Sequence, residues 1–186
     1  MGKHSKKVTI DSANLMNKGM EVIEARWLFD VPFAKIKVMV HPGSIVHSMV
    51  EFSDGSVKAQ LGVPDMRLPI QYALSHPERW PNSELPRLDF DKIASLPFGA
   101  VDLGRYPCLR LAFEAGEAAG TCPAVLSAAD EVAVERFLND EIAFPDIPRL
   151  LEDVLGGHSP ADDLSLENIL AADDWARRMA KGWSSK

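Results

Sequence analysis

The stretch IDSANLMNKGME, residues 10–21, joins a predicted strand to a predicted helix and indicates how the chain begins to fold. Residues 7–11 form a β-like run, and residues 13–29 place apolar side chains near helical spacing. A strand-to-helix junction presents free N–H groups and a partial positive charge to an anion. The stretch therefore predicts a mixed α/β region with an anion-binding site at its first junction.

The polar side chains at this junction suit a phosphate group and a metal ion. They are a hydroxyl, a carboxamide, an ammonium and a carboxylate, contributed by Ser12, Asn17, Lys18 and Glu21. The first three donate hydrogen bonds to phosphate oxygens, and the carboxylate is a hard oxygen ligand for a divalent cation. Gly19 would let a ligand approach the backbone closely. The alternative is ordinary turn chemistry with Ser12 as a helix cap, and the residues alone leave both interpretations open.

The rest of the chain predicts strands first and helices afterwards. Strand signals cover residues 35–41, 45–52 and 56–61, with an Asp54-Gly55 hairpin turn and a short helix over residues 66–74. Prolines suppress regular structure between residues 75 and 104, at positions 77, 81, 86 and 97. Helical spacing returns over residues 107–120, 123–139, 146–155 and 164–180.

These signals predict an α+β fold in three consecutive parts. Residues 1–74 form a mixed α/β catalytic portion with a small sheet, residues 75–104 a proline-rich extended linker, and residues 105–186 a C-terminal helical bundle domain. A chain of 186 residues is long enough to bury a core in this way.

Composition narrows the classes of partner and the compartment. The net charge is −7 with no basic block, which argues against a nucleic-acid surface. No apolar run reaches the about 20 residues that a bilayer span needs, and no signal-peptide segment is visible, so no membrane partner is expected. Cys108 and Cys122 lack metal-site spacing and are expected to be buried free thiols. Together these features predict a cytoplasmic protein.

Three long segments carry a resemblance to a known family. They read IDSANLMNKGMEVIEARWLFD, VHPGSIVHSMVEFSDGSVKAQLGVPDMRLPI and RYPCLRLAFEAGEAAG, and the similarity runs from about Lys7 to Asp174. The chain resembles 1-deoxy-D-xylulose 5-phosphate reductoisomerases. That resemblance implies conversion of 1-deoxy-D-xylulose 5-phosphate into 2-C-methyl-D-erythritol 4-phosphate, with NADPH and Mg²⁺ or Mn²⁺, in non-mevalonate isoprenoid biosynthesis.

The resemblance also implies roles for residues of the first segment. Ser12, Asn17, Lys18 and Glu21 match substrate-binding positions, and Glu21 matches one of three carboxylates that bind the divalent ion. Lys18 and Glu21 are the expected catalytic residues.

Three further positions carry expectations of their own. His47 is an expected substrate neighbour, although a histidine at a strand edge is more often a hydrogen-bonded structural residue. Met66 and Gly2 match cofactor contacts; for Met66 the alternative is a helix start in which Asp65 caps and Met66 fills core.

The parts that this chain lacks shape the functional expectation. There is no Gly-rich dinucleotide fingerprint, and the family carries its NADPH-binding domain and the other metal carboxylates ahead of the first segment. The chain is therefore expected to be a partial enzyme, inactive alone, that needs an N-terminal NADPH-binding half or forms a homodimer. The alternative is a non-catalytic assembly or dimerisation module.

One departure from the family pattern lies in the helical region. Residues 127–131 read SAADE where the family favours NAANE, which puts local hydrogen bonding in doubt there but touches no expected catalytic role.

Overall fold

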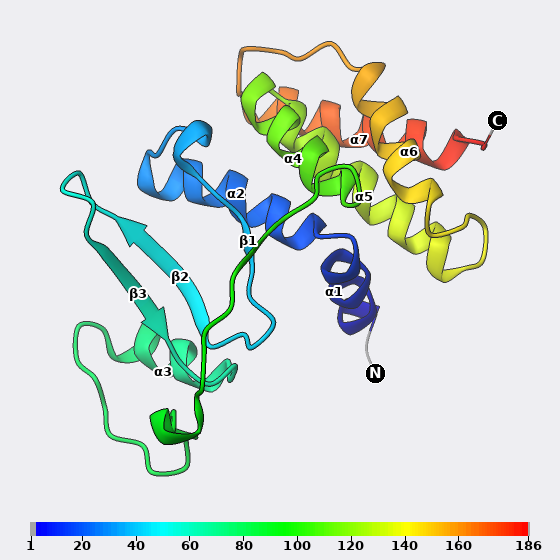
Figure 1. Cartoon of the computed structure of the whole chain (residues 1–186). Coiled ribbons are helices and arrows are strands. Elements are labelled where there is room, and N and C mark those ends of the chain that lie inside the picture. The colour runs from blue at the N-terminus through cyan, green and yellow to red at the C-terminus, as the bar shows by residue number, and fades with distance from the viewer. Residues whose placement is uncertain (1–2, 186) are drawn as a thin grey trace. The chain divides into compact units, whose positions relative to one another are not determined.

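Helices make up most of the chain in the computed structural model, which describes residues 3–185 (Figure 1). Contacts divide these residues into two units: one combines residues up to Val38 with those from Val101 on, and the other runs from Met39 to Ala100. The first, called the helical unit below, contains α1 (Lys3–Ala13), α2 (Met16–Phe29), η1 (Phe33–Lys35), α4 (Pro107–Ala118), α5 (Cys122–Leu138), α6 (Asp146–Gly156) and α7 (Leu166–Gly182).

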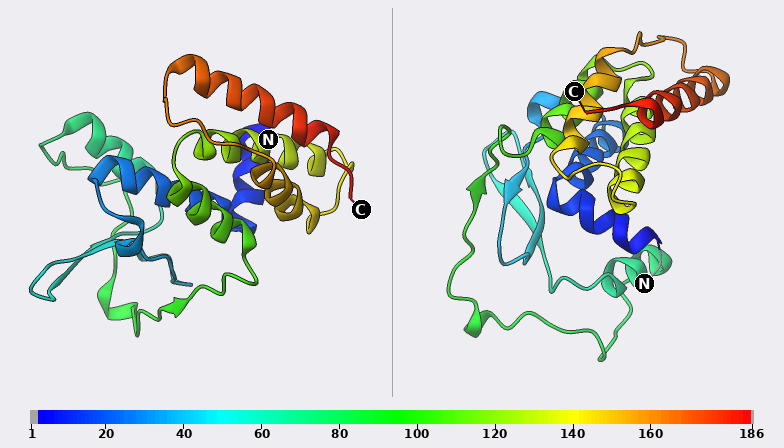
Figure 2. Two further views of the ribbon diagram at one scale, coloured as in Figure 1. Left: turned by 90° about the horizontal axis from the view of Figure 1, so that it is seen from above. Right: turned by 90° about the vertical axis from the view of Figure 1, so that its right-hand side faces the viewer.

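The helical unit is organised around α5. This helix packs against α4, α6 and α7, while α2 lies along α4 (Figure 2). Apolar side chains at helical spacing meet there and form one continuous core, to which Leu126, Ile147 and Leu150 contribute fully buried side chains. Both cysteines lie in this core as free thiols, as predicted. The four predicted C-terminal helices are confirmed, with bounds that differ by about two residues or fewer.

The strand predicted over residues 7–11 is wrong, because these residues belong to α1. In a helix Lys7 and Asp11 lie on one face, and their side chains form an ion pair there. Ile10 turns toward the core, and Asp11 is 7% exposed. The local sequence pattern did not show that other helices of the chain would pack against this segment.

The helix predicted from residue 13 begins at Met16. Leu15 adopts a left-handed conformation with φ of 62°, which interrupts the helical path between α1 and α2. The Asn14 side-chain oxygen accepts a hydrogen bond from the Met16 backbone N–H at 2.9 Å. The junction is therefore a turn between two helices rather than a strand-to-helix junction.

The second unit, called the strand unit below, carries two antiparallel pairs. Strand β2 (Val46–Glu51) pairs with β3 (Val57–Leu61), and β1 (Met39–Val40) pairs with β4 (Gly99–Ala100). The unit also contains α3 (Arg67–Ser75) and η2 (Phe90–Lys92). The predicted strand over residues 35–41 shrinks to β1, since η1 already occupies its first residue.

The predicted hairpin turn between β2 and β3 is confirmed. Gly55 has φ of +83°, which a residue with a side chain adopts with strain. The Asp54 carboxylate accepts hydrogen bonds from the Ser56 N–H at 2.9 Å and the Ser56 hydroxyl at 2.6 Å. These contacts set the register in which Glu51 faces Val57.

The grouping of segments differs from the predicted order of three consecutive parts. Residues 3–38 pack with the C-terminal helices rather than with the strands, because α2 lies along α4. Residues 75–104 are largely irregular but contain η2 and β4, and β4 pairs with β1.

The fold class is α+β, as predicted. Among the residues that the structure describes, no helix has the length and apolar character to cross a bilayer.

Candidate functional site

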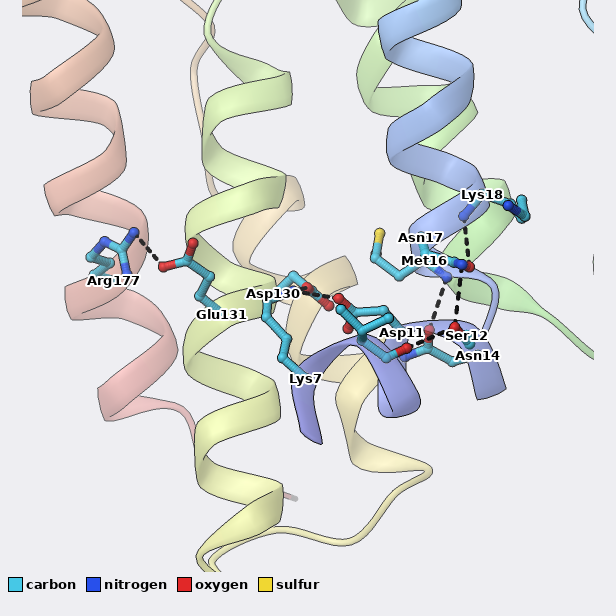
Figure 3. Close-up of polar contacts among 11 residues, drawn as sticks. Lys7, Asp11, Ser12, Asn14, Met16, Asn17, Lys18, Asp130, Glu131 and Arg177 are labelled. Carbon is cyan, nitrogen blue, oxygen red and sulfur yellow. Dashed lines mark hydrogen bonds and ion pairs between the residues drawn. The ribbon is translucent and has the colours of Figure 1, made fainter. Parts of the chain in front are cut away.

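The predicted polar residues gather at the turn between α1 and α2. Ser12, near the end of α1, accepts a hydrogen bond at its hydroxyl from the Asn17 side-chain N–H, at 3.3 Å (Figure 3). The Ser12 hydroxyl in turn donates to the Val8 carbonyl oxygen at 2.7 Å. The Asn17 side-chain oxygen accepts from the Lys18 backbone N–H at 2.8 Å. Two residues from different helices therefore present one polar edge.

Lys18 and Glu21 continue this edge along α2. The Lys18 ammonium lies 2.6 Å from a Glu21 carboxylate oxygen, three positions apart on the helix. The two side chains are 44% and 55% exposed, so both are accessible to a ligand. We call Ser12, Asn17, Lys18 and Glu21 the polar row. The structure brings these four predicted residues together on the surface of the helical unit.

Gly19 does not have the role that its position in the motif suggested. It is buried, and a Cβ added there would lie 2.4 Å from the Cβ of Ala112 on α4. The missing side chain lets α2 approach α4 closely instead of opening the backbone to a ligand. The glycine thus seats the helix that carries Lys18 and Glu21.

A buried charged cluster lies beside the polar row. The Lys7 ammonium is 2.5 Å from a carboxylate oxygen of Asp11 and 2.5 Å from one of Asp130 on α5. Asp130 is 0% exposed, and its second oxygen has no hydrogen-bond partner, as is also true of Asp11. We call Lys7, Asp11 and Asp130 the charged cluster. Asp130 belongs to the SAADE segment, which departs from the family pattern. Its ion pair with Lys7 joins α1 to α5.

Burial governs the electrostatics of the charged cluster. It raises the pKa of Asp130 to about 6, the nearby Asp11 charge adds to this, and Lys7 opposes it. Burial alone would lower the pKa of the Lys7 ammonium, but the charges and hydrogen bonds of Asp130 and Asp11 outweigh it, so that pKa is raised. The ammonium is therefore held in its charged form between two carboxyl groups.

Sequence reasoning missed Lys7 and Asp130. The four-residue spacing of Lys7 and Asp11 was a visible sign of a helical ion pair. No local sign pointed to Asp130, which lies 123 positions from Lys7 along the chain.

His47 lies on β2 in the strand unit. Its ring Nε2 is 2.9 Å from the Ser44 carbonyl oxygen, so Nε2–H donates and Nδ1 remains as an acceptor. The side chain is exposed and stands beside Gly62, where an added Cβ would lie 3.6 Å from the ring. His41 instead bonds the Pro97 carbonyl at 2.8 Å and stacks on Phe98, which ties the ends of the strand unit together.

Met66, at the start of α3, is 70% exposed. The alternative prediction that it fills core is therefore wrong, and its side chain is available for contact. Asp65 accepts hydrogen bonds from the Arg67 guanidinium and backbone, which lower the pKa of Asp65 to about 2. Gly2, the other predicted cofactor contact, lies outside the described residues.

Glu21 offers one carboxylate to a divalent cation. Among the described residues, no group of three His, Cys, Asp or Glu side chains is placed to hold a metal ion. Mg²⁺ sites use several oxygen ligands, so this carboxylate fits one corner of such a site. The Lys18 ammonium now occupies the same oxygen and would have to move aside for a cation.

The helical unit also has a shallow hollow of about 410 Å³, lined by residues of α2, η1 and α4 that include Trp27, Phe33 and Glu117. None of the polar row lines it.

Comparison with known proteins identifies the class of domain first. Residues 61–179 match the family described as "DXP reductoisomerase C-terminal domain", and residues 1–29 match "1-deoxy-D-xylulose 5-phosphate reductoisomerase C-terminal domain". The chain belongs to the 1-deoxy-D-xylulose 5-phosphate reductoisomerase family.

Individual relatives support this membership. The chain is 60% identical over 176 residues to 1-deoxy-D-xylulose 5-phosphate reductoisomerase of Chlorobium phaeobacteroides, which covers 95% of this chain and 46% of the relative. The solved enzyme of Zymomonas mobilis in complex with NADPH aligns with a TM-score of 0.88 and 46% identity, over 94% of this chain and 46% of that chain.

A second solved structure, DOX-P reductoisomerase in complex with NADPH, fosmidomycin and magnesium, aligns with a TM-score of 0.84 and 42% identity, over 97% of this chain and 46% of that one. The chain thus spans about half the length of the relatives it matches.

Proposed function

We propose that this chain supplies the substrate-binding part of an NADPH-dependent reductoisomerase. The reaction is the conversion of 1-deoxy-D-xylulose 5-phosphate into 2-C-methyl-D-erythritol 4-phosphate in non-mevalonate isoprenoid biosynthesis. The observation that carries the proposal is the polar row on a family fold: two neutral donors, an ammonium and a carboxylate on one accessible edge. Such a set suits a phosphorylated sugar beside a cation.

Each residue of the polar row has a role that its chemistry supports. Ser12 and Asn17 donate hydrogen bonds to phosphate or sugar oxygens, and they already meet across the helix turn. Lys18 places a compact positive charge beside them. Glu21 provides one oxygen ligand for Mg²⁺ or Mn²⁺.

In the strand unit, we propose His47 as a substrate contact and Met66 as a cofactor contact. The free Nδ1 of His47 would accept a hydrogen bond from substrate, and the exposed Met66 side chain would pack on the nicotinamide. When bound, NADPH supplies the hydride and the divalent cation supplies Lewis-acid polarisation.

The proposed activity requires a part that precedes this segment in the relatives. That part would bring the dinucleotide-binding domain and the remaining metal carboxylates, so we expect no turnover from the chain alone. We further propose that the assembled enzyme is a cytoplasmic homodimer.

The test is to combine the chain with an NADPH-binding N-terminal half and to follow NADPH oxidation with 1-deoxy-D-xylulose 5-phosphate and Mg²⁺. Turnover in the mixture and not in either half is the expected result. Folded halves that associate without turnover, under conditions where an intact relative is active, would contradict the proposal.

Variants locate the activity at the polar row. Lys18→Ala removes a charge-assisted hydrogen bond and should raise KM by roughly 10- to 100-fold, the equivalent of about 1.5–3 kcal/mol. Lys181→Ala, a change of an exposed lysine on α7, is the control and should leave KM unchanged.

The carboxylate of the polar row is tested by its metal dependence. Glu21→Gln should weaken the dependence of turnover on Mg²⁺, whereas Glu24→Gln, one turn further along α2, should not.

A second candidate function, a non-catalytic assembly module, is favoured by one observation. Apolar side chains on and beside strands β2 and β3 are exposed: Met49 by 43%, Val50 by 57%, Phe52 by 43% and Val57 by 55%. Light scattering of the chain with and without an intact relative decides between the two. Stable association that alters the oligomeric state without restoring turnover favours the assembly module.

A further inference from the structure

A charged contact between helices ties α1 to the rest of the helical unit. Along residues 6–13 Asp11 is the one buried side chain and Ile10 is partly buried, whereas Val8 is 59% exposed. An ion pair links α1 to the helical body, because the Lys7 ammonium reaches the fully buried Asp130 on α5. An ion pair of this kind is directional, so it sets the position of α1 more narrowly than a small apolar contact does.

The position of α1 decides whether Ser12 joins the other residues of the polar row. Ser12 is carried by α1, whereas Asn17 and Lys18 are carried by α2, and their contact spans the turn at Leu15. Because Ser12 lies five positions after Lys7, a shift of α1 relative to α5 moves the Ser12 hydroxyl away from Asn17.

We propose that Lys7 and Asp130 are positioning residues for the reductoisomerase reaction, which seat α1 so that Ser12 meets Asn17 and Lys18 in one substrate-binding edge. The inference rests on the proposed function and deepens it. Neither residue touches the proposed substrate; both act through the placement of Ser12. The buried carboxylate on α5 thereby connects the helical domain to the site.

The neighbouring position on α5 offers a matched control. Figure 3 shows Asp130 directed toward Lys7 and Asp11, and Glu131 directed the other way, toward Arg177 on α7. The Glu131–Arg177 distance is 2.8 Å, so this carboxylate also joins two helices. A change at Glu131 therefore disturbs an interhelical ion pair of the same helix without touching α1.

The experiment uses the chain assembled with an NADPH-binding N-terminal half. Lys7→Met should raise KM for 1-deoxy-D-xylulose 5-phosphate about tenfold or more while kcat changes less, since the loss is in substrate placement. Lys7→Arg should restore KM, because a guanidinium can bond two carboxylates. Glu131→Gln should leave KM unchanged.

Lys7→Met leaves two acidic groups without a counter-charge and can fail to fold. The double variant Lys7→Met with Asp130→Leu replaces the ionic contact by an apolar one of similar size. It should fold and show the same rise in KM. Hydrogen exchange of backbone amides 10–17 gives a second readout: it should quicken in the Lys7 variants and not in Glu131→Gln.

The outcomes separate this inference from the proposed function. If the unmodified assembly is active and the Lys7 variants keep its KM, the positioning role is overturned and the function stands. If the unmodified assembly is inactive, the proposed function is wrong. Hydrogen exchange alone then tests whether Lys7 and Asp130 hold α1 in position. Unchanged exchange over α1 in the folded Lys7 variants would then overturn the positioning role as well.

Discussion

The two units of this chain differ in how much apolar surface each one buries. The helical unit holds a continuous core in which Leu126, Ile147 and Leu150 are 0% exposed. In the strand unit Leu85 is the one buried apolar residue among residues 39–100, and the strands β2 and β3 are mostly exposed on both faces. Apolar burial is the main favourable term in folding, so the two units differ in their own sources of stability.

The difference shows what each unit can do by itself. A two-stranded hairpin with no buried face is marginal in water. The helical unit has a core that can hold its shape and with it the polar row, whereas the strand unit, which carries His47 and Met66, buries little apolar surface of its own. Four predictions test this comparison, from the largest expected effect to the smallest.

The first prediction compares two leucines. Leu150→Ala opens a cavity in the helical core and should lower the free energy of unfolding by about 2–5 kcal/mol. Leu74→Ala removes the same atoms from a side chain on α3 that is 78% exposed. It should change the free energy of unfolding by about 0.5 kcal/mol or less. Urea denaturation followed by circular dichroism measures both. Equal effects would break the comparison.

The second prediction concerns pH. The pKa of Asp130 is raised from 3.8 to about 6, so the folded state binds a proton more readily than the unfolded state. The stabilisation from this group is complete below pH 3.8 and is lost as pH rises to about 6, which lowers the free energy of unfolding by roughly 3 kcal/mol across that interval. Lys7 and Asp11 face the group from α1, Cys108 from α4, and Glu131 adjoins it on α5.

Two substitutions serve as controls for the pH effect. Asp130→Asn should abolish the loss between pH 4 and 6, because the amide side chain does not titrate. Asp65→Asn in the strand unit should not change the loss of stability between pH 4 and 6. Hydrogen bonds from Arg67 lower the pKa of Asp65 to about 2, so this carboxyl group titrates below that interval. A loss that persists in Asp130→Asn assigns the titration to another group.

The third prediction compares two glycines of the helical unit. Gly19→Ala forces a Cβ to within 2.4 Å of the Ala112 Cβ and should lower the free energy of unfolding by about 1–3 kcal/mol. Gly156→Ala, at the end of α6 with no atom within 4 Å of the added carbon, should raise it by up to about 1 kcal/mol. Thermal denaturation distinguishes the opposite signs. A neutral Gly19→Ala would mean that α2 and α4 are not closely packed.

The fourth prediction has the smallest effect and lies in the strand unit. Gly55→Ala strains a turn at φ of +83° and should favour opening of the hairpin by about 1 kcal/mol, without changing global unfolding. Hydrogen exchange of the β2 and β3 amides measures the opening. Gly99→Ala, whose added carbon meets no atom within 4 Å, is the control. A global loss equal to the local one would show that the two units unfold together.

Local pattern was sufficient where a segment's structure depends on its own residues. The apolar spacing of residues 123–139 predicts α5 because Val125, Ala129, Val132 and Ala133 recur at intervals of three and four residues, the spacing of one helical turn. The Asp54-Gly55 turn predicts the β2–β3 hairpin because its geometry requires those residues. The order of side chains in residues 12–21 likewise indicated a polar row at one helix turn.

Neighbouring residues were enough to predict the family, the α+β class, the C-terminal helices and the grouping of Ser12 with Asn17, Lys18 and Glu21. Three features emerged only from the packing of distant segments: residues 7–11 are helical, Gly19 seats α2 on α4, and Lys7 meets Asp130. The physical reason is range. Helical periods and tight turns act over a few residues, whereas a buried ion pair between positions 123 apart exists only after the helices have packed.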